Sequence, residues 1–168
     1  MHETMPAPCH DTRAIQRDDA SRAKIIAFEQ ALAQHPEAHY GDWQEQCPLT
    51  HRFAEGCYVR EIFIPKGMAL TGKIHKHSHP NFLLRGEVLV YTEQGGVEHL
   101  KAPLAMISEP GTKRVVVALA DTVWITVHVT SETDLARIEE EVIAPSYDAY
   151  EVYRAQLAPL PHRKELPA

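Results

Sequence analysis

Three histidines, His75, His77 and His79, lie close together in a chain of 168 residues that has eleven histidines in all. Imidazole is a common ligand for Zn, Fe, Ni and Mn, and side chains two residues apart point to the same face of an extended strand. If the strand stays straight, His75 and His77 converge on one ion. An exposed polar loop is the alternative interpretation, because lysine, serine and asparagine lie among and beside these histidines.

A fourth histidine, His128, lies in the β-rich run Thr122–Thr130, where alternation places it on the same face as Trp124. Closure of a barrel can bring this strand beside the segment around His75, so His128 is a candidate remote ligand. A buried histidine that is hydrogen-bonded to the backbone is an equally good interpretation. His51 precedes the first expected strand and can reach the same barrel mouth, although a contact within a loop is an equally good interpretation.

Short β-rich runs separated by turn residues fill residues 50–130, and these runs must position the histidines. Many short strands at such spacing predict a sandwich or a barrel. Polar residues occur on both faces of the runs, as expected for a barrel interior that holds a polar site as well as a core. The expected strands are Cys57–Ile64, Leu70–His75, Phe82–Thr92, Val97–Leu100, Ala105–Ser108, Lys113–Ala118 and Thr122–Thr130.

An amphipathic helix is expected before the β-rich region. Between Asp19 and about Gln34, the apolar residues Ile25, Phe28 and Leu32 recur at spacings of three and four. Such a stripe usually faces a core, so we expect the helix to cover one end of the main domain. Residues 1–18 have no period and predict a mobile tail. We interpret residues 19–49 as the helix and a connector.

Two more helices are expected after the β-rich region. Ser131 and Asp134 have the spacing of a capping box, and Pro145 is the expected end of the first helix. The second is expected to run from Ser146 or Tyr147 to Leu157. We therefore interpret residues 50–130 as the β-barrel and residues 131–168 as C-terminal helices and a tail.

Composition argues against several classes of function. The net charge is −6 and no run of Lys or Arg exceeds two residues, so we expect no nucleic-acid binding. No apolar stretch reaches the length of a membrane span and no signal-peptide pattern occurs, so we expect no membrane association and a cytoplasmic location. The three cysteines are irregularly spaced and fit neither a disulfide framework nor a cysteine-rich zinc site. Nucleotide-binding and α/β-hydrolase motifs do not occur.

Two segments resemble the motifs of the cupin superfamily. The stretch from the turn Pro65-Lys66-Gly67, through the histidine cluster, to Gly86 is similar to the first motif, in which a Pro-Gly turn precedes His and Glu ligands and a glycine. The segment Glu109–Arg114 is similar to the second motif, which supplies a last ligand. The resemblance covers residues 57–130. It implies an all-β core, a cupin-type jelly-roll β-barrel, with flanking N- and C-terminal α-helices.

The resemblance also implies which residues occupy the family's ligand positions. Anchored on the turn and on Gly86, the second His of the family falls on His75 and its Glu falls on His79. The other two positions fall on cations, Lys73 and Arg114. The usual set of three His and one Glu is therefore absent, and a rewired site that uses further histidines is expected instead.

The expected site has two sets of residues. The expected metal ligands are His75, His79 and His128, with His77 as a fourth ligand or a neighbour. The expected substrate-binding residues are Arg114, Lys73, Tyr58 and His51. Arginine suits bidentate contact with an anionic carboxylate or enolate. Tyr58, Arg60 and Tyr91 can line a barrel pocket, although packing explains them equally well.

We therefore predict a small single-domain cupin that binds a divalent transition metal (Zn, Fe, Ni or Mn) and a small oxygenated or anionic molecule. A metal-dependent dioxygenase or isomerase is implied only by the resemblance, because a fold does not fix a function. The alternative is a metal-free cupin that serves as a ligand-binding or structural protein, with a looser likeness to small cupin-like proteins of phage and bacterial genomes. A homodimer is expected in either case.

Overall fold

The computed structural model describes residues 19–38, 45–94 and 96–157. The tail expected over residues 1–18 and the last eleven residues of the chain lie outside these ranges. The helices are α1 (Asp19–Ala33), α2 (Leu135–Val142) and α3 (Tyr147–Gln156). The strands are β1 (Leu49–Ala54), β2 (Cys57–Ile64), β3 (Ala69–Thr71), β4 (Ile74–His75), β5 (His79–Arg85), β6 (Glu87–Thr92), β7 (Gly96–Lys101), β8 (Leu104–Ser108), β9 (Arg114–Ala118), β10 (Thr122–Val129) and β11 (Ile143–Ala144).

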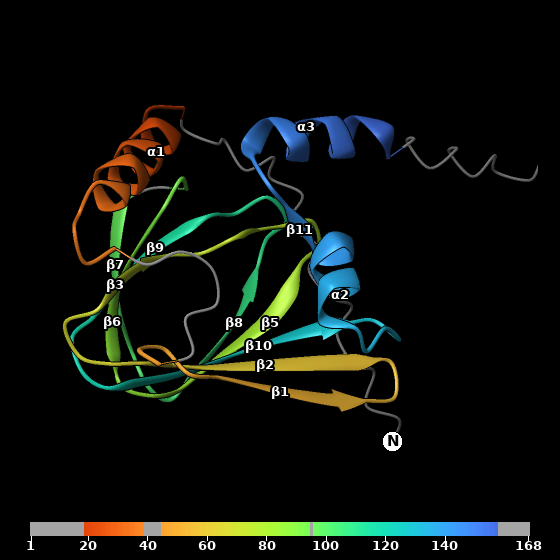
Figure 1. Cartoon of the computed structure of the whole chain (residues 1–168), viewed down its shortest axis with the longest axis horizontal. Helices are drawn as coiled ribbons and strands as arrows, with labels where there is room; N and C mark the ends of the chain where they lie inside the picture. The colour runs from red at the N-terminus through yellow and green to blue at the C-terminus, as the bar shows by residue number, and fades with distance from the viewer. Residues whose placement is uncertain (1–18, 39–44, 95, 158–168) are drawn as a thin grey trace, which may run out of the picture.

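Two antiparallel sheets enclose the core (Figure 1). A five-stranded sheet has the order β1-β2-β10-β5-β8, and a four-stranded sheet has the order β3-β9-β6-β7. Without β1 and the two short strands β4 and β11, eight strands remain. Counted along the chain, the first of them pairs with the last and so on inward: β2 pairs with β10, β3 with β9, β5 with β8 and β6 with β7. This is the arrangement of an eight-stranded jelly roll. The expected all-β jelly-roll fold is confirmed.

The inner face of the five-stranded sheet is apolar at one end and polar at the other. Side chains that face each other across neighbouring strands form rows. The apolar row consists of Ile62, Trp124, Leu83 and Leu104. The next row consists of Arg60, Thr126, Asn81 and Met106. Beyond it, Tyr58 faces His128 and His79 faces Ser108. The polar end of the barrel is therefore the end that carries histidines.

The hydrophobic core fills the apolar end of the barrel. Side chains of the five-stranded sheet, including Leu83 and Trp124, pack there against Val88, Val90 and Val116 of the four-stranded sheet. Leu83 and Val88 are fully buried. Burial of one such side chain contributes about 1.5–3 kcal/mol to folding, so this end holds the two sheets together.

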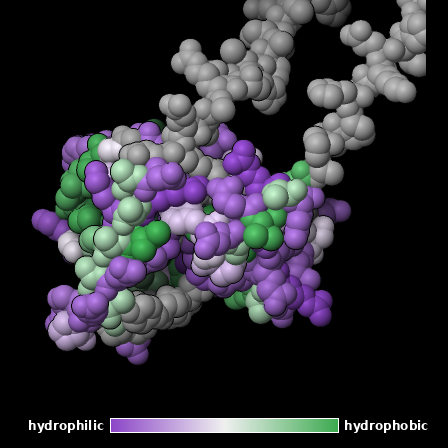
Figure 2. Space-filling view, turned by 90° about the horizontal axis from the view of Figure 1, so that it is seen from above, coloured by the Kyte–Doolittle hydropathy of each residue, from purple (hydrophilic) through white to green (hydrophobic). Residues whose placement is uncertain are grey.

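Helices lie outside the barrel on two sides (Figure 1). α1 packs near β6 and β3, where Tyr91 donates a hydrogen bond to Ser21 (3.0 Å) and Thr71 donates one to Glu29 (3.0 Å). The face on which α1 and α3 lie is mostly hydrophilic, with smaller hydrophobic areas between the polar residues (Figure 2). Among the described residues, no helix is long and apolar enough to cross a membrane.

The C-terminal segment is tied to the polar end of the barrel. β11 pairs with β4, and Ile138 and Val142 of α2 pack against Tyr58 of β2. In Figure 1, α2 lies beside the end of β10, and β11 runs from α2 toward α3. The sequence pattern did not predict β11, because two residues are too few to show a period.

Local turns change several expected boundaries. The run expected over Leu70–His75 is broken between β3 and β4, and the run expected over Phe82–Thr92 is divided at Gly86 into β5 and β6. The strand Leu49–Ala54 was not expected. The capping box expected for Ser131 and Asp134 is wrong: Asp134 is itself the N-cap, and its side chain accepts the backbone N–H of Arg137. An acidic residue directly before the first helical turn suits this role.

Gly86 sets the sharp turn between β5 and β6. Its φ is +98°, in the region that favours glycine. A Cβ atom there would lie 2.7 Å from the backbone oxygen of Asp121 and 2.7 Å from the Cα of Thr122. Backbone atoms cannot move aside as a flexible side chain can, so only glycine fits.

We expect Gly86→Ala to lower the free energy of unfolding by about 3–4 kcal/mol, because backbone strain and a clash with backbone add together. Gly56→Ala is the matched control: Gly56 also has a positive φ (71°), but a Cβ atom there meets nothing within 4 Å. This variant should lose only about 1–2 kcal/mol. Urea unfolding of both variants measures the difference. Equal losses would show that the close approach at Gly86 is not a constraint.

Candidate metal centre

Three histidines from three different strands meet at the polar end of the barrel. His75 comes from β4, His79 begins β5 and His128 lies near the end of β10. Their candidate ligand nitrogens lie within 4.8 Å of one another. The ring centroids of His75 and His79 are 4.1 Å apart, and each lies 5.0 Å or less from that of His128. We call these three residues the histidine triad.

The ring of His79 is oriented by the backbone. Its Nδ1 lies 3.2 Å from the carbonyl oxygen of His77, which can only accept a hydrogen bond. Nδ1 therefore carries the proton, and Nε2 keeps a free lone pair. That Nε2 is buried and has no hydrogen-bond partner in the described part of the protein. A metal-binding histidine usually has its second ring nitrogen fixed in this way.

His75 also offers an unpartnered nitrogen. Its Nδ1 is buried without a hydrogen-bond partner among the described residues. The backbone of His75 is held on both sides: β4 pairs with β11, which sets Ile143 opposite His75, and Gly111 donates its N–H to the His75 carbonyl (2.7 Å). Buried polar atoms normally have partners, so two orphaned nitrogens in one triad need an explanation.

Burial keeps the triad neutral. It lowers the pKa of His75 to about 2 and of His128 to about 4, with further lowering by neighbouring histidines and by Arg60. Burial also lowers the pKa of His79, although its bond to the His77 carbonyl opposes this. Neutral imidazole is the form that binds a metal ion. The donor set therefore fits a divalent transition metal, with three nitrogens and at least one position open.

A buried hydrogen-bond network lies beside the triad. Arg114 Nη2 donates to the hydroxyl of Ser108 (2.6 Å), which also receives a bond from the side-chain amide of Asn81. The amide oxygen of Asn81 accepts from Trp124 Nε1 (3.0 Å), and its nitrogen donates to the backbone oxygen of His79 (3.2 Å). The indole, the amide and the guanidinium are thus fixed in one chain of hydrogen bonds.

Arg114 lies near the triad as a half-buried cation. Burial lowers its pKa, whereas Glu98 and Glu93 raise it. Arginine keeps its charge at neutral pH despite such shifts. The positive charge of Arg114 contributes to the lowered pKa values of His75 and His79. Ser108, to which Arg114 donates, faces His79 across β5 and β8, so Arg114 lies at the same polar end of the barrel as the triad.

Tyr58 and His51 lie next to His128. Tyr58 is buried, its ring stacks with His128 at a centroid distance of 6.0 Å, and its hydroxyl shares a 2.7 Å hydrogen bond with His51 Nδ1. Because His51 lies on β1, the outer strand of the sheet, this pair extends from the triad toward the sheet edge.

Two other expected site residues lie apart from the triad. Lys73 falls in the break between β3 and β4, and its Nζ pairs with Glu139 of α2 at 2.7 Å. The ring of His77 meets Tyr153 edge-on, with Nε2 3.5 Å from the tyrosine hydroxyl. His77 contributes its carbonyl oxygen, not its ring, to the orientation of His79.

Sequence reasoning missed part of the site. Asn81 and Ser108 were not expected to contribute, and Arg60 was only one of several possible pocket residues. The signal was present in the alternation of β2, where Tyr58, Ile62 and Ile64 face the interior and Arg60 shares their face. Asn81 likewise shares a face with His79 and Leu83 of β5, all of which are buried.

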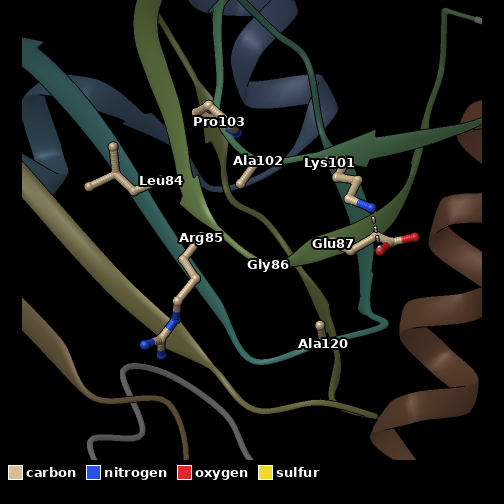
Figure 3. A pocket seen from close by; sticks show the side chains of 8 residues that line it. All are labelled: Leu84, Arg85, Gly86, Glu87, Lys101, Ala102, Pro103 and Ala120. Carbon is tan, nitrogen blue, oxygen red and sulfur yellow. Dashed lines mark ion pairs between the residues drawn. The ribbon is translucent and has the colours of Figure 1, made fainter.

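A surface hollow of about 360 Å³ lies at the opposite end of β5 from His79 (Figure 3). It is lined by residues around the Gly86 turn and by Pro103, and Glu87 and Lys101 face each other at its side. It is open and shallow and contains no histidine. The chemistry of the triad is therefore separate from this hollow.

Comparison with solved structures finds proteins whose folds are weakly similar to this chain. A protein with a double-stranded beta-helix domain from Klebsiella pneumoniae is 17% identical over 55% of this chain and 84% of its own, with a TM-score of 0.45. A cupin superfamily protein from Desulfitobacterium hafniense is 6% identical over 54% and 83%, with a TM-score of 0.44. KdgF from a Halomonas species is 16% identical over 60% and 94%, with a TM-score of 0.46.

No family model matches the chain, and no curated protein matches it. The fold is established by the chain's own strand order. It is a jelly roll. At these identities and TM-scores, the likenesses say nothing about ligand or activity.

The pH dependence of stability tests the burial of the triad. A lowered pKa in the folded state means that the unfolded chain binds protons first, so stability falls as the pH drops below about 6.5. We expect metal-free protein to lose roughly 2 kcal/mol from His128 alone between pH 7 and pH 5. Urea unfolding after EDTA treatment measures this loss. His128→Gln should show a smaller loss, and an unchanged pH dependence in that variant would contradict the burial of a neutral His128.

Proposed function

We propose that this protein binds a divalent transition metal through His75, His79 and His128 and holds a small anionic, oxygenated molecule beside it. The main support is His79, whose Nδ1 is fixed by the His77 carbonyl while its buried Nε2 has no hydrogen-bond partner in the described part of the chain. A ring nitrogen of each of the other two histidines lies within 4.8 Å of a ring nitrogen of His79. A structural role for His79 would leave a desolvated nitrogen without compensation. Zn, Fe, Ni and Mn all accept imidazole ligands.

The remaining residues of the site have distinct roles in this proposal. When bound, the metal supplies a Lewis acid that polarises an oxygen of the ligand. Arg114, held by Ser108, binds an anionic group of that ligand. Tyr58 limits the site beside His128 and is itself held by His51. Asn81 and Trp124 support the site from below, because the Asn81 amide donates to the His79 backbone oxygen and accepts from Trp124 Nε1.

Such a site suits a dioxygenase or an isomerase that acts on a small molecule, and this reaction class stays a proposal. The homodimer and the cytoplasmic location also stay predictions. Lys73 has no part in the proposed site, because its ammonium group is paired with Glu139.

We expect about one equivalent of zinc, iron, nickel or manganese per chain in protein purified without a histidine tag and, if needed, reconstituted. Elemental analysis measures this content. His79→Ala should abolish it and His128→Ala should lower it at least tenfold, because each removes one of three nitrogen donors.

Two controls separate loss of a ligand from loss of a histidine in general. His77→Ala removes the ring beside Tyr153 but keeps the carbonyl that orients His79, so metal content should remain. His99→Ala removes an exposed histidine on β7 that pairs with Glu87 on β6, and this variant should also keep the metal. Less than about a tenth of an equivalent in wild-type protein would refute the proposal and favour a metal-free binding or structural protein.

A further inference from the structure

The outer face of the five-stranded sheet is apolar and open to solvent. Along each strand, side chains alternate between the barrel interior and the outside, so the residues between the buried ones point outward. β10, in the middle of the sheet, directs only valine and isoleucine side chains outward. We use the name outer apolar face for the outward side of β2, β10, β5 and β8, whose main residues are Val59, Ile125, Val127, Phe82, Leu84 and Ile107.

Neighbouring strands join these side chains into continuous rows. Ile125 faces Phe82 across β10 and β5, and Val127 faces Val59 across β10 and β2. The exposed fractions of Phe82, Leu84 and Ile107 are 37%, 52% and 62%. Single exposed apolar side chains are ordinary on a protein surface, but a continuous patch of them marks an interaction surface.

The size of this side of the sheet suits a partner of similar breadth. Five strands about 4.8 Å apart and about 20 Å long span roughly 500 Å². Two such faces together bury about 1,000 Å², which is the lower limit for a specific protein–protein interface. A hollow of about 210 Å³, lined by Phe82, Leu84 and Pro103 among others, lies over β5 and β8 and offers space for a partner's side chain.

The charges on this side of the sheet do not oppose contact with an identical face. β10 and β8 contain no Asp, Glu, Lys or Arg. Glu61 of β2 is paired with Arg52 of β1 at 3.0 Å. Arg85, at the end of β5, lies with its guanidinium carbon 5.8 Å from the ring centre of Phe63. An apolar centre with paired or marginal charges is typical of the core and rim of an interface.

The rest of the chain offers little that could cover this face. No segment outside the described ranges has more than three large apolar side chains: Met1, Met5 and Ile15 in residues 1–18, Tyr40 and Trp43 in residues 39–44, and Leu160 and Leu166 in residues 158–168. Such segments are too poor in apolar side chains to cover four strands. A second sheet can do so, because two sheets pack face to face over their whole breadth.

We propose that the outer apolar face is the interface of a homodimer, in which two copies of the chain pack these faces against each other about a two-fold axis. In such a contact the same patch serves both copies, so an identical chain supplies the matching flat sheet. β10 and β5 carry His128 and His79 on their inner side. The dimer contact therefore supports, from outside, two of the strands that hold the histidine triad.

The mass of the protein in solution is the first test. At about 50 µM, untagged full-length protein should have the mass of two chains of 18.9 kDa each, because interfaces of this kind reach micromolar or tighter dissociation constants. Size-exclusion chromatography with light scattering measures this mass. The mass of a single chain at that concentration would overturn the proposal.

Lysine variants locate the interface. Ile107→Lys and Phe82→Lys each place a charge on the outer apolar face, so each should weaken the dimer at least about tenfold. Val97→Lys is the matched control, because Val97 is 64% exposed but lies on β7, at the edge of the other sheet. It should change the dissociation constant less than twofold. A dimer of unchanged affinity in both Ile107→Lys and Phe82→Lys would place the interface elsewhere and overturn the proposal.

A variant without a new charge keeps the proposal testable if a lysine variant does not fold. The thiol introduced by Ile107→Cys should react with iodoacetamide at least about tenfold more slowly in concentrated than in dilute protein, because the dimer buries it. The thiol introduced by Val97→Cys should react at the same rate in both. Mass spectrometry of the peptides separates these thiols from the native cysteines. Equal rates at both concentrations for Ile107→Cys would overturn the proposal.

Discussion

The register of β10 between β2 and β5 is the constraint on which both the core and the site depend. β10 is paired along its whole length with β2 and in its first half with β5, so its inner face is fixed from two sides. That face carries Trp124 into the apolar core and His128 into the triad. A shift of one residue would turn both side chains outward. Folding of the core therefore assembles the site.

Much of this arrangement could be predicted from alternation and turn residues. The bounds expected for Cys57–Ile64 match β2, and the shared face of Trp124 and His128 follows from a period of two. The relation between His75 and His77 could not be predicted in this way, because β4 ends at His75 and the chain bends after it. The contact that fixes His75, β11, is too short to leave a pattern.

The polar side chains at the histidine end of the barrel stabilise the fold less than apolar side chains would. Neutral imidazoles and two half-buried arginines replace apolar side chains that would pack without a desolvation cost. The chain of hydrogen bonds from Trp124 through Asn81 to Ser108 limits this cost where partners exist. The ring nitrogens of His75 and His79 have no such partner in the described part of the chain. Both of these nitrogens belong to the histidine triad, where a bound metal ion would give them a partner.

The most direct test of this account is anomalous diffraction at the zinc absorption edge from crystals grown with zinc. The account predicts one peak at about 2.0–2.1 Å from Nε2 of His79 and from one ring nitrogen each of His75 and His128. A crystal with full zinc occupancy at other residues, or with no peak at the triad, would contradict it.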